Sequence, residues 1–178
     1  MTVRRFLTAL ACVFALGATG AYQGAPVDGE RHFLYVASPG IRNYVEYGGV
    51  GVIVFDMDQG HKFVKRIPTF DVVGGKAAGD VKGIAASADT IRLYITTPKR
   101  VAAIDLETEK LVWDREYEGG CDRLAISPDG KILYVPSFEG PHWLAIGAMS
   151  GDVIQTIVTK SGAHNTIYGL DGKHAYLA

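Results

Sequence analysis

Five polar side chains recur at nearly constant intervals along the chain, and they are the residues best suited to chemistry. Asp122 lies 40 residues after Lys82, and His164 and Asn165 lie 42 residues after Asp122 and Arg123. A histidine can ligate a metal or donate a hydrogen bond to an anion, and we predict His164 as the first ligand-binding residue of the set. Convergent polar groups are the usual basis of a binding site. The alternative is that these groups only satisfy backbone and water on a wet, polar wall.

Other sequence patterns exclude several common kinds of reaction centre. No two of the five histidines have the spacing of a metal site, and no His-Glu-x-x-His or Gly-x-Ser-x-Gly motif occurs. The glycine-rich residues 48–51 lack the spacing of a dinucleotide-binding loop, and Gly74-Gly-Lys76 is followed by alanine, which excludes a phosphate-binding loop. The sequence therefore assigns no catalytic residue and no metal site, and the cofactor stays unknown.

A repeat of about 40 residues sets the spacing of the five side chains. Residues 83–89 align with residues 123–129 at an offset of 40, and residues 129–135 align with residues 171–177 at an offset of 42. An earlier copy begins at Phe33 and carries an insertion of about 19 residues relative to this period. The chain is therefore built from repeated units, and equivalent positions in them should occupy equivalent places in the fold.

Each unit has the pattern of short β-strands. Residues 91–97 and 131–136 are β-branched and aromatic runs between turn residues. Ser127-Pro-Asp-Gly130 is typical of a tight turn, and no long stretch after the N-terminus has the 3.6-residue period of a helix. Units of about 40 residues with four short strands are typical of β-propeller blades. Such blades stack radially because one thin sheet cannot bury both of its faces.

We therefore predict an all-β fold: a β-propeller fragment with about three four-stranded antiparallel blades and the start of a fourth. The blades fall near residues 32–80, 81–120 and 121–162, with a partial blade at 163–178. The sequence stops inside a strand, so we expect a truncated record of a full propeller, and the rival expectation is an oligomer that completes the ring.

This predicted fold brings the five polar residues into one region. In a propeller, the segment before the innermost strand of each blade lines the central channel. We call residues 80–82, 121–123 and 163–165 the approach segments, and we expect them to meet at the channel mouth. The predicted ligand-binding residues are then His164, Asn165, Arg123, Asp122 and Lys82.

The repeat also carries a resemblance. Ala125-Ile-Ser-Pro-Asp-Gly-Lys-Ile-Leu-Tyr-Val135 resembles the repeat of the YVTN family of secreted, YncE-like β-propellers, and the resemblance spans about residues 32–178. Residues 163–167 resemble a segment of that family whose histidine faces the axis, and the family implies seven blades in the intact protein. Residues 101–113 look like a pyrroloquinoline-quinone enzyme repeat, from which they depart at Glu109, where that repeat has glycine.

The N-terminus has the pattern of a secretory signal peptide. Arg4 and Arg5 precede an apolar run over residues 6–16, and small residues follow up to Ala21. The run is shorter than the roughly 20 residues that a membrane span needs, although a retained anchor is the alternative. We predict a signal peptide at 1–21, a propeller domain at 22–178, and a secreted or periplasmic location. Cys121 is then the only cysteine, and we expect it to be a buried apolar residue.

The composition and net charge limit the classes of partner that the protein is expected to bind. The net charge of −1 becomes −3 without residues 1–21, so no basic stripe for nucleic acid is expected, and a hydrophobic fraction of 48% excludes a disordered chain. We expect a small molecule, metal or protein at the channel, and no membrane contact beyond the signal peptide.

Three functions stay open at this point. The favoured one is a non-catalytic binding protein that uses the channel mouth. The second is an enzyme resembling lactonase or quinoprotein (amine) dehydrogenase-like propellers. The third is an interaction module whose apolar arm would be residues 41–47.

Overall fold

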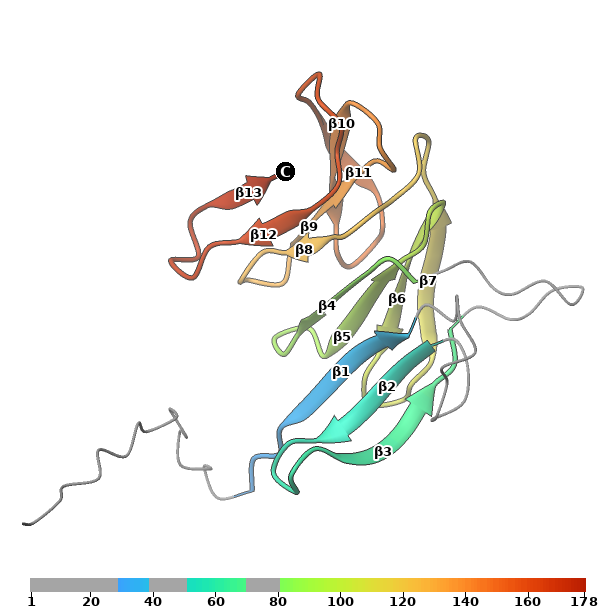
Figure 1. Cartoon of the computed structure of the whole chain (residues 1–178), viewed down its shortest axis with the longest axis vertical. Helices are drawn as coiled ribbons and strands as arrows, with labels where there is room; N and C mark the ends of the chain where they lie inside the picture. The colour runs from blue at the N-terminus through green and yellow to red at the C-terminus, as the bar shows by residue number, and fades with distance from the viewer. Residues whose placement is uncertain (1–28, 39–50, 70–80) are drawn as a thin grey trace, which may run out of the picture. The chain divides into compact units, whose positions relative to one another are not determined.

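The computed structural model describes residues 29–38, 51–69 and 81–178, and all regular structure in them is β-strand (Figure 1). The first sheet has three strands, β1 (Phe33–Ser38), β2 (Gly51–Asp56) and β3 (Lys62–Ile67). The second has β4 (Gly83–Ser87), β5 (Arg92–Thr96), β6 (Arg100–Asp105) and β7 (Leu111–Glu116). The third has β8 (Ala125–Ile126), β9 (Ile132–Pro136), β10 (His142–Gly147) and β11 (Val153–Val158), and the fourth has β12 (Thr166–Tyr168) and β13 (Ala175–Leu177).

This architecture confirms the predicted fold class of a β-propeller fragment. Within every sheet the strands follow chain order and pair antiparallel with their neighbours. The two complete sheets have four strands each, and β12 and β13 form the predicted start of a fourth. The first sheet shows three strands in the described residues. Residues 39–50 and 70–80 of that predicted unit lie outside the described ranges.

Side-chain alternation explains why the sheets stack. Leu93 and Ile95 of β5 pack against the first sheet, whereas Tyr94 between them packs against the third. The first interface buries Val52, Val54, Ile67, Leu93, Ile95, Ala102 and Ile104. The second buries Tyr94, Val101, Ala103, Leu133, Val135, Leu144 and Ile146. Each large apolar side chain buried this way contributes about 1.5–3 kcal/mol, so the second sheet depends on both of its neighbours.

Two tryptophan indole groups form hydrogen bonds between successive sheets. The Trp113 Nε1–H of β7 donates to the Ala148 carbonyl oxygen of the third sheet at 3.1 Å. The Trp143 Nε1–H of β10 donates to Thr166 Oγ1 of the fourth sheet at 3.1 Å. Both tryptophans therefore belong to the interfaces between sheets.

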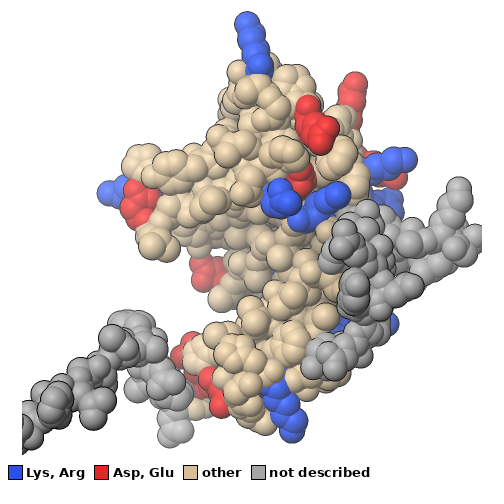
Figure 2. Space-filling model, viewed as in Figure 1, with Lys and Arg blue, Asp and Glu red and all other residues tan. Residues whose placement is uncertain are grey.

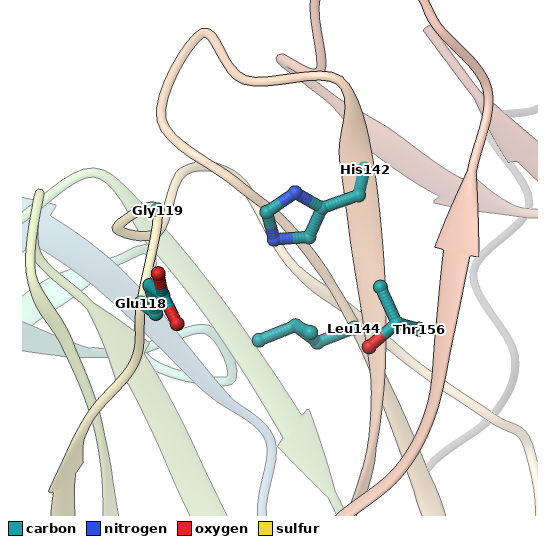
Figure 3. A pocket seen from close by; sticks show the side chains of 5 residues that line it. All are labelled: Glu118, Gly119, His142, Leu144 and Thr156. Carbon is teal, nitrogen blue, oxygen red and sulfur yellow. The ribbon is translucent and has the colours of Figure 1, made fainter.

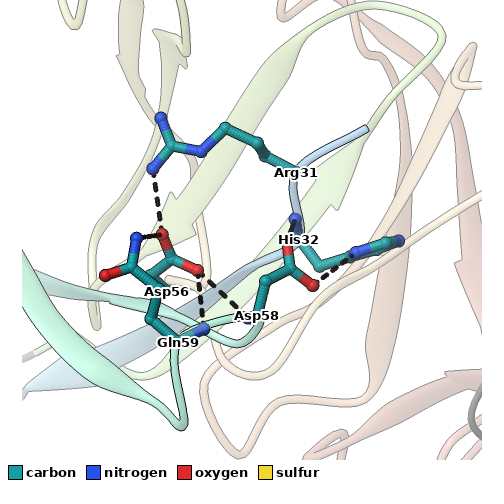
Figure 4. Close-up of polar contacts among 5 residues, drawn as sticks. All are labelled: Arg31, His32, Asp56, Asp58 and Gln59. Carbon is teal, nitrogen blue, oxygen red and sulfur yellow. Dashed lines mark hydrogen bonds and ion pairs between the residues drawn. The ribbon is translucent and has the colours of Figure 1, made fainter. Parts of the chain in front are cut away.

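Acidic residues in the hairpin turns act as caps. The Asp56 carboxylate is buried and accepts hydrogen bonds from Arg31 Nη2 at 2.9 Å and from the Asp58 amide at 3.0 Å (Figure 4). Asp58 in turn accepts from the His32 amide, and this bond lowers the pKa of its carboxyl group. Asp105 fills the same role in the second sheet by accepting from the Thr108 amide at 2.7 Å. Each of these acids accepts hydrogen bonds from its own turn or from the segment before β1, so their contacts are accounted for within the protein.

The turn after β6 also explains a departure from the repeat pattern. Glu109, which stands where the quinone-enzyme repeat has glycine, has a φ of 58°. Gly151, in the corresponding turn of the third sheet, has a φ of 76°. This left-handed backbone is the one that glycine adopts without steric cost. The second sheet therefore keeps the turn geometry while using a residue that fits it less well.

The innermost strands lie side by side. β4 contacts β8, and β8 contacts β12. At Gly83, the first residue of β4, a Cβ atom would lie 2.8 Å from the Arg123 Cα and 2.8 Å from Thr96 Oγ1. Only a residue without a side chain allows the second and third sheets to approach this closely.

Some predictions fall outside the described residues. These are the signal peptide at 1–21, the apolar arm at 41–47 and Asp80 of the first approach segment. The described part of the chain has no helix that is long and apolar enough to span a membrane.

Gly83→Ala should destabilise the protein by about 1–3 kcal/mol, because the added methyl group meets backbone atoms that cannot move independently. Urea unfolding of the full chain measures the change. Gly162→Ala is the matched control, because a Cβ atom there has nothing within 4 Å. Equal free energies of unfolding for the two variants would contradict the close approach of the inner strands.

Candidate functional site

The approach segments of the second, third and fourth sheets lie next to one another. Lys82 directly precedes β4, and its amide donates to the Thr96 carbonyl oxygen at 2.8 Å. Arg123 precedes β8, and its amide donates to the His164 carbonyl oxygen at 3.4 Å. Arg123 also forms an isolated parallel bridge with Asn165. Together with the close contact of Gly83 and Arg123, these bonds bring residues from three repeats to one place.

Asp122 and His164 make the direct side-chain contact of this cluster. His164 Nδ1 lies 2.6 Å from Asp122 Oδ2. The aspartate side chain is 3% exposed and the histidine side chain is 55% exposed. In the tautomer that carries its hydrogen on Nδ1, the ring donates to this carboxylate and presents Nε2 on its other side. The pair thus consists of a buried acid that orients an accessible imidazole.

The backbone around Asp122 is held firmly. Its amide donates to the Pro136 carbonyl oxygen at 3.0 Å, and its own carbonyl oxygen accepts from Thr96 Oγ1 at 2.7 Å. The His164 and Asn165 amides both donate to the Ala178 carbonyl oxygen, at 3.0 and 2.8 Å. The carboxylate and the ring are therefore placed by the ends of strands from neighbouring sheets.

The remaining three predicted residues contribute hydrogen-bond donors. The Lys82 ammonium nitrogen lies 5.4 Å from the centre of the Phe138 ring, within the range of a cation–π contact. Arg123 is exposed. The Asn165 carboxamide oxygen accepts from the Thr166 amide at 3.0 Å, which leaves its NH₂ group for other contacts. Sequence phase thus predicted that the approach segments lie together, whereas the Asp122–His164 contact depends on rotamers that the sequence does not specify.

A separate pocket lies between the second and third sheets (Figure 3). It has a volume of about 440 Å³ and is lined by Glu118 and Gly119 of the loop after β7, His142 and Leu144 of β10, and Thr156 of β11. None of the five predicted residues lines it. The sequence offers no signal for this pocket, because Glu118 lies on a loop and Thr156 on an outer strand, and neither belongs to a motif.

The one described cysteine is a core residue. Cys121 is fully buried in the core between the second and third sheets. Burial raises the pKa of its thiol from 9.0 to about 12. A thiol with so high a pKa is a poor nucleophile at neutral pH, as expected for a structural cysteine.

Two further observations limit the chemistry. The described ranges contain no group of three or more His, Cys, Asp or Glu residues that could hold a metal ion. On the face shown in Figure 2, basic and acidic side chains are interspersed, with no continuous basic stripe.

Comparison with known proteins identifies the fold and not the family. No family model matches the chain, and no curated protein matches it. Matches to solved structures include 576 chains, one of which is hydrazine synthase from Kuenenia stuttgartiensis. That match has a TM-score of 0.59 and 17% sequence identity, and it covers 80% of this chain and 40% of the hydrazine synthase chain. This chain thus spans less than half the length of that protein. The similarity shows a β-propeller fold, which hosts many chemistries.

The stability of the protein should fall between pH 9 and pH 12. In that range the unfolded chain releases the Cys121 proton, while the folded protein keeps it up to a pKa of about 12. The free energy of unfolding attributable to this thiol is therefore present below pH 9 and decreases by up to about 4 kcal/mol as the pH rises to 12. Urea unfolding at a series of pH values measures the slope.

Cys121→Ala is the control for this slope. Burial also raises the pKa of Tyr117 to about 12, and the charge of Cys121 raises it further, so the alanine variant loses both the Cys121 titration and that part of the Tyr117 shift. The alanine variant should therefore show a shallower decline than the parent. Identical slopes would show that the Cys121 thiol does not titrate as its burial requires.

Proposed function

We propose that this chain is part of a secreted or periplasmic binding protein of the YVTN-repeat kind, which holds a ligand at the mouth of the propeller channel. The ligand site is the cluster of Lys82, Asp122, Arg123, His164 and Asn165. Secretion is supported by the charged, apolar and small-residue pattern of residues 1–21. The repeat motif at residues 125–135 supports the family.

The observation that carries this proposal is the buried carboxylate of Asp122 against the exposed ring of His164, at 2.6 Å. Burying a charge is costly unless it is paired. Here the partner is a ring that is about half exposed to solvent. Orienting a histidine through Nδ1 leaves Nε2 for a ligand, an arrangement that recurs in metal and catalytic sites.

A second pair in the same protein shows what a purely local contact looks like. His174 Nδ1 lies 2.5 Å from Asp171 Oδ2, but both side chains are exposed, at 64% and 46%. The two residues are three apart in one turn. That contact fixes a turn, whereas the Asp122–His164 contact joins two repeats 42 residues apart.

Ligand binding can be tested by thermal unfolding of the full chain with separate probes: Ni²⁺, Zn²⁺, inorganic phosphate, citrate, choline and glucose. At least one probe should raise the Tm, because binding at 100 times the Kd adds about 2.7 kcal/mol to stability. His164→Ala should abolish the shift, and His174→Ala should retain it. The proposal fails if no probe raises the Tm, or if every shift survives in His164→Ala.

The same pair supports an enzyme as the second candidate. A carboxylate on Nδ1 is the arrangement by which an imidazole becomes a general base. His164 Nε2 would take a proton from water as the water oxygen bonds to a lactone or ester carbonyl carbon, and Asp122 would stabilise the resulting imidazolium. The donors of Arg123 and Asn165 would face the oxyanion that forms as the carbonyl π bond opens. When this tetrahedral intermediate collapses, the C–O bond to the leaving oxygen would break, and the imidazolium would return its proton to that oxygen, which gives a carboxylic acid and an alcohol.

Hydrolysis of 4-nitrophenyl acetate and of a γ-lactone tests this candidate. If the protein hydrolyses either substrate with His164 as the general base, His164→Ala should lower kcat/KM by 10²–10⁴-fold, the usual contribution of a general base. His174→Ala should retain the rate. A rate equal to that of buffer would eliminate the hydrolase and leave the binding proposal in place.

A further inference from the structure

We infer that the ligand of the channel-mouth cluster carries an oxyanion, a carboxylate or a phosphate group. This inference rests on the proposed binding function and adds the chemical class of the ligand. It follows from which groups of the cluster are already paired and which remain open.

Asp122 is the one acid among the five residues of the cluster, and its carboxylate is already paired. Asp122 is buried, and its carboxylate faces His164 Nδ1. The groups left for a ligand are the Lys82 ammonium, the Arg123 guanidinium and the Asn165 NH₂ group. All three are hydrogen-bond donors, and two of them carry a positive charge. A ligand that matches them must accept hydrogen bonds and carry negative charge.

Arg123 stands apart from the other arginines. Arg31, Arg100 and Arg115 form ion pairs, with Asp56, Asp114 and Asp152 respectively. Arg92 donates to the Met149 carbonyl oxygen, and Arg66 also has a partner. Among the arginines at described positions, Arg123 alone has no side-chain hydrogen bond or ion pair. Its guanidinium is therefore available, and its planar fork of donors matches the two oxygens of a carboxylate or phosphate.

Lys82 adds a second cation from the neighbouring repeat. It is half-buried, and no ion pair involves it in the described parts of the chain. Its ammonium lies over the Phe138 ring, which belongs to the third sheet. The Gly83–Arg123 contact keeps the backbones of the two basic residues next to each other. Two basic side chains that start from adjacent backbone segments, and that have no acidic partner among the described residues, favour an anionic ligand.

The same inventory argues against the other ligand classes. A metal ion would meet two cations and find only one open ligand atom, His164 Nε2, because the Asp122 side chain is turned to Nδ1. A neutral polyol needs acceptors as well as donors, and the exposed groups of this cluster offer mainly donors. An oxyanion satisfies the donors and the charge together.

Isothermal titration of the full chain tests this inference with six probes at equal ionic strength, because salt screens exposed charges. Inorganic phosphate and citrate represent the two oxyanion classes, and choline, glucose, Ni²⁺ and Zn²⁺ represent the others. Phosphate or citrate should bind, and Arg123→Gln or Lys82→Gln should each weaken binding by at least tenfold. Lys173→Gln removes the same charge from an exposed turn, and it should leave the affinity unchanged.

The outcomes distinguish failure of the oxyanion inference from failure of the proposed binding function. Binding of phosphate alone assigns a phosphate-bearing ligand, and binding of citrate alone assigns a carboxylate. Binding of choline, glucose or a metal that requires His164, without binding of either oxyanion, would overturn the oxyanion class and keep the site. Equal affinities in Arg123→Gln, Lys82→Gln and Lys173→Gln would also overturn it. No binding by any probe would overturn both. Unfolding curves without ligand identify any variant that fails to fold. If either Arg123→Gln or Lys82→Gln fails to fold, the affinity of the other variant tests the inference.

Discussion

A sheet of four short strands has two apolar faces, and the structure follows from the need to cover both of them. In β5, Leu93 and Ile95 point to one neighbour and Tyr94 to the other. No single sheet can be stable alone, since half of its buried side chains would face water. The repeat period, the short turns and the alternation of apolar side chains along the strands all serve this stacking.

The candidate site is a by-product of the same stacking. Residues 82, 122 and 164 are separated by 40 and 42 positions, yet equivalent places in successive sheets become neighbours. The Thr96 hydroxyl and the missing side chain at Gly83 join the second sheet directly to the segment that carries Asp122. The carboxylate is thus placed by strand ends and not by a flexible loop, which gives the His164 ring a defined partner.

The repeat made much of this fold predictable. Alternating strands, the turn at residues 127–130 and the buried Cys121 follow from patterns of residue type, and the structure agrees with each. The position of the five polar residues follows from their phase in the repeat, whereas their use by a ligand stays a prediction. The pocket beside His142 could not be predicted, because Glu118 and Thr156 meet only through tertiary packing. The left-handed backbone at Glu109 is likewise set by its turn and not by residue preference.

The two tryptophans of the chain occupy different interfaces, one between the second and third sheets and one between the third and fourth. Each indole N–H is bonded across its own boundary, so each ring emits from an environment that exists only while those two sheets remain docked. Fluorescence from variants retaining one indole at a time would therefore reveal whether the array melts as a single unit or peels apart from one end.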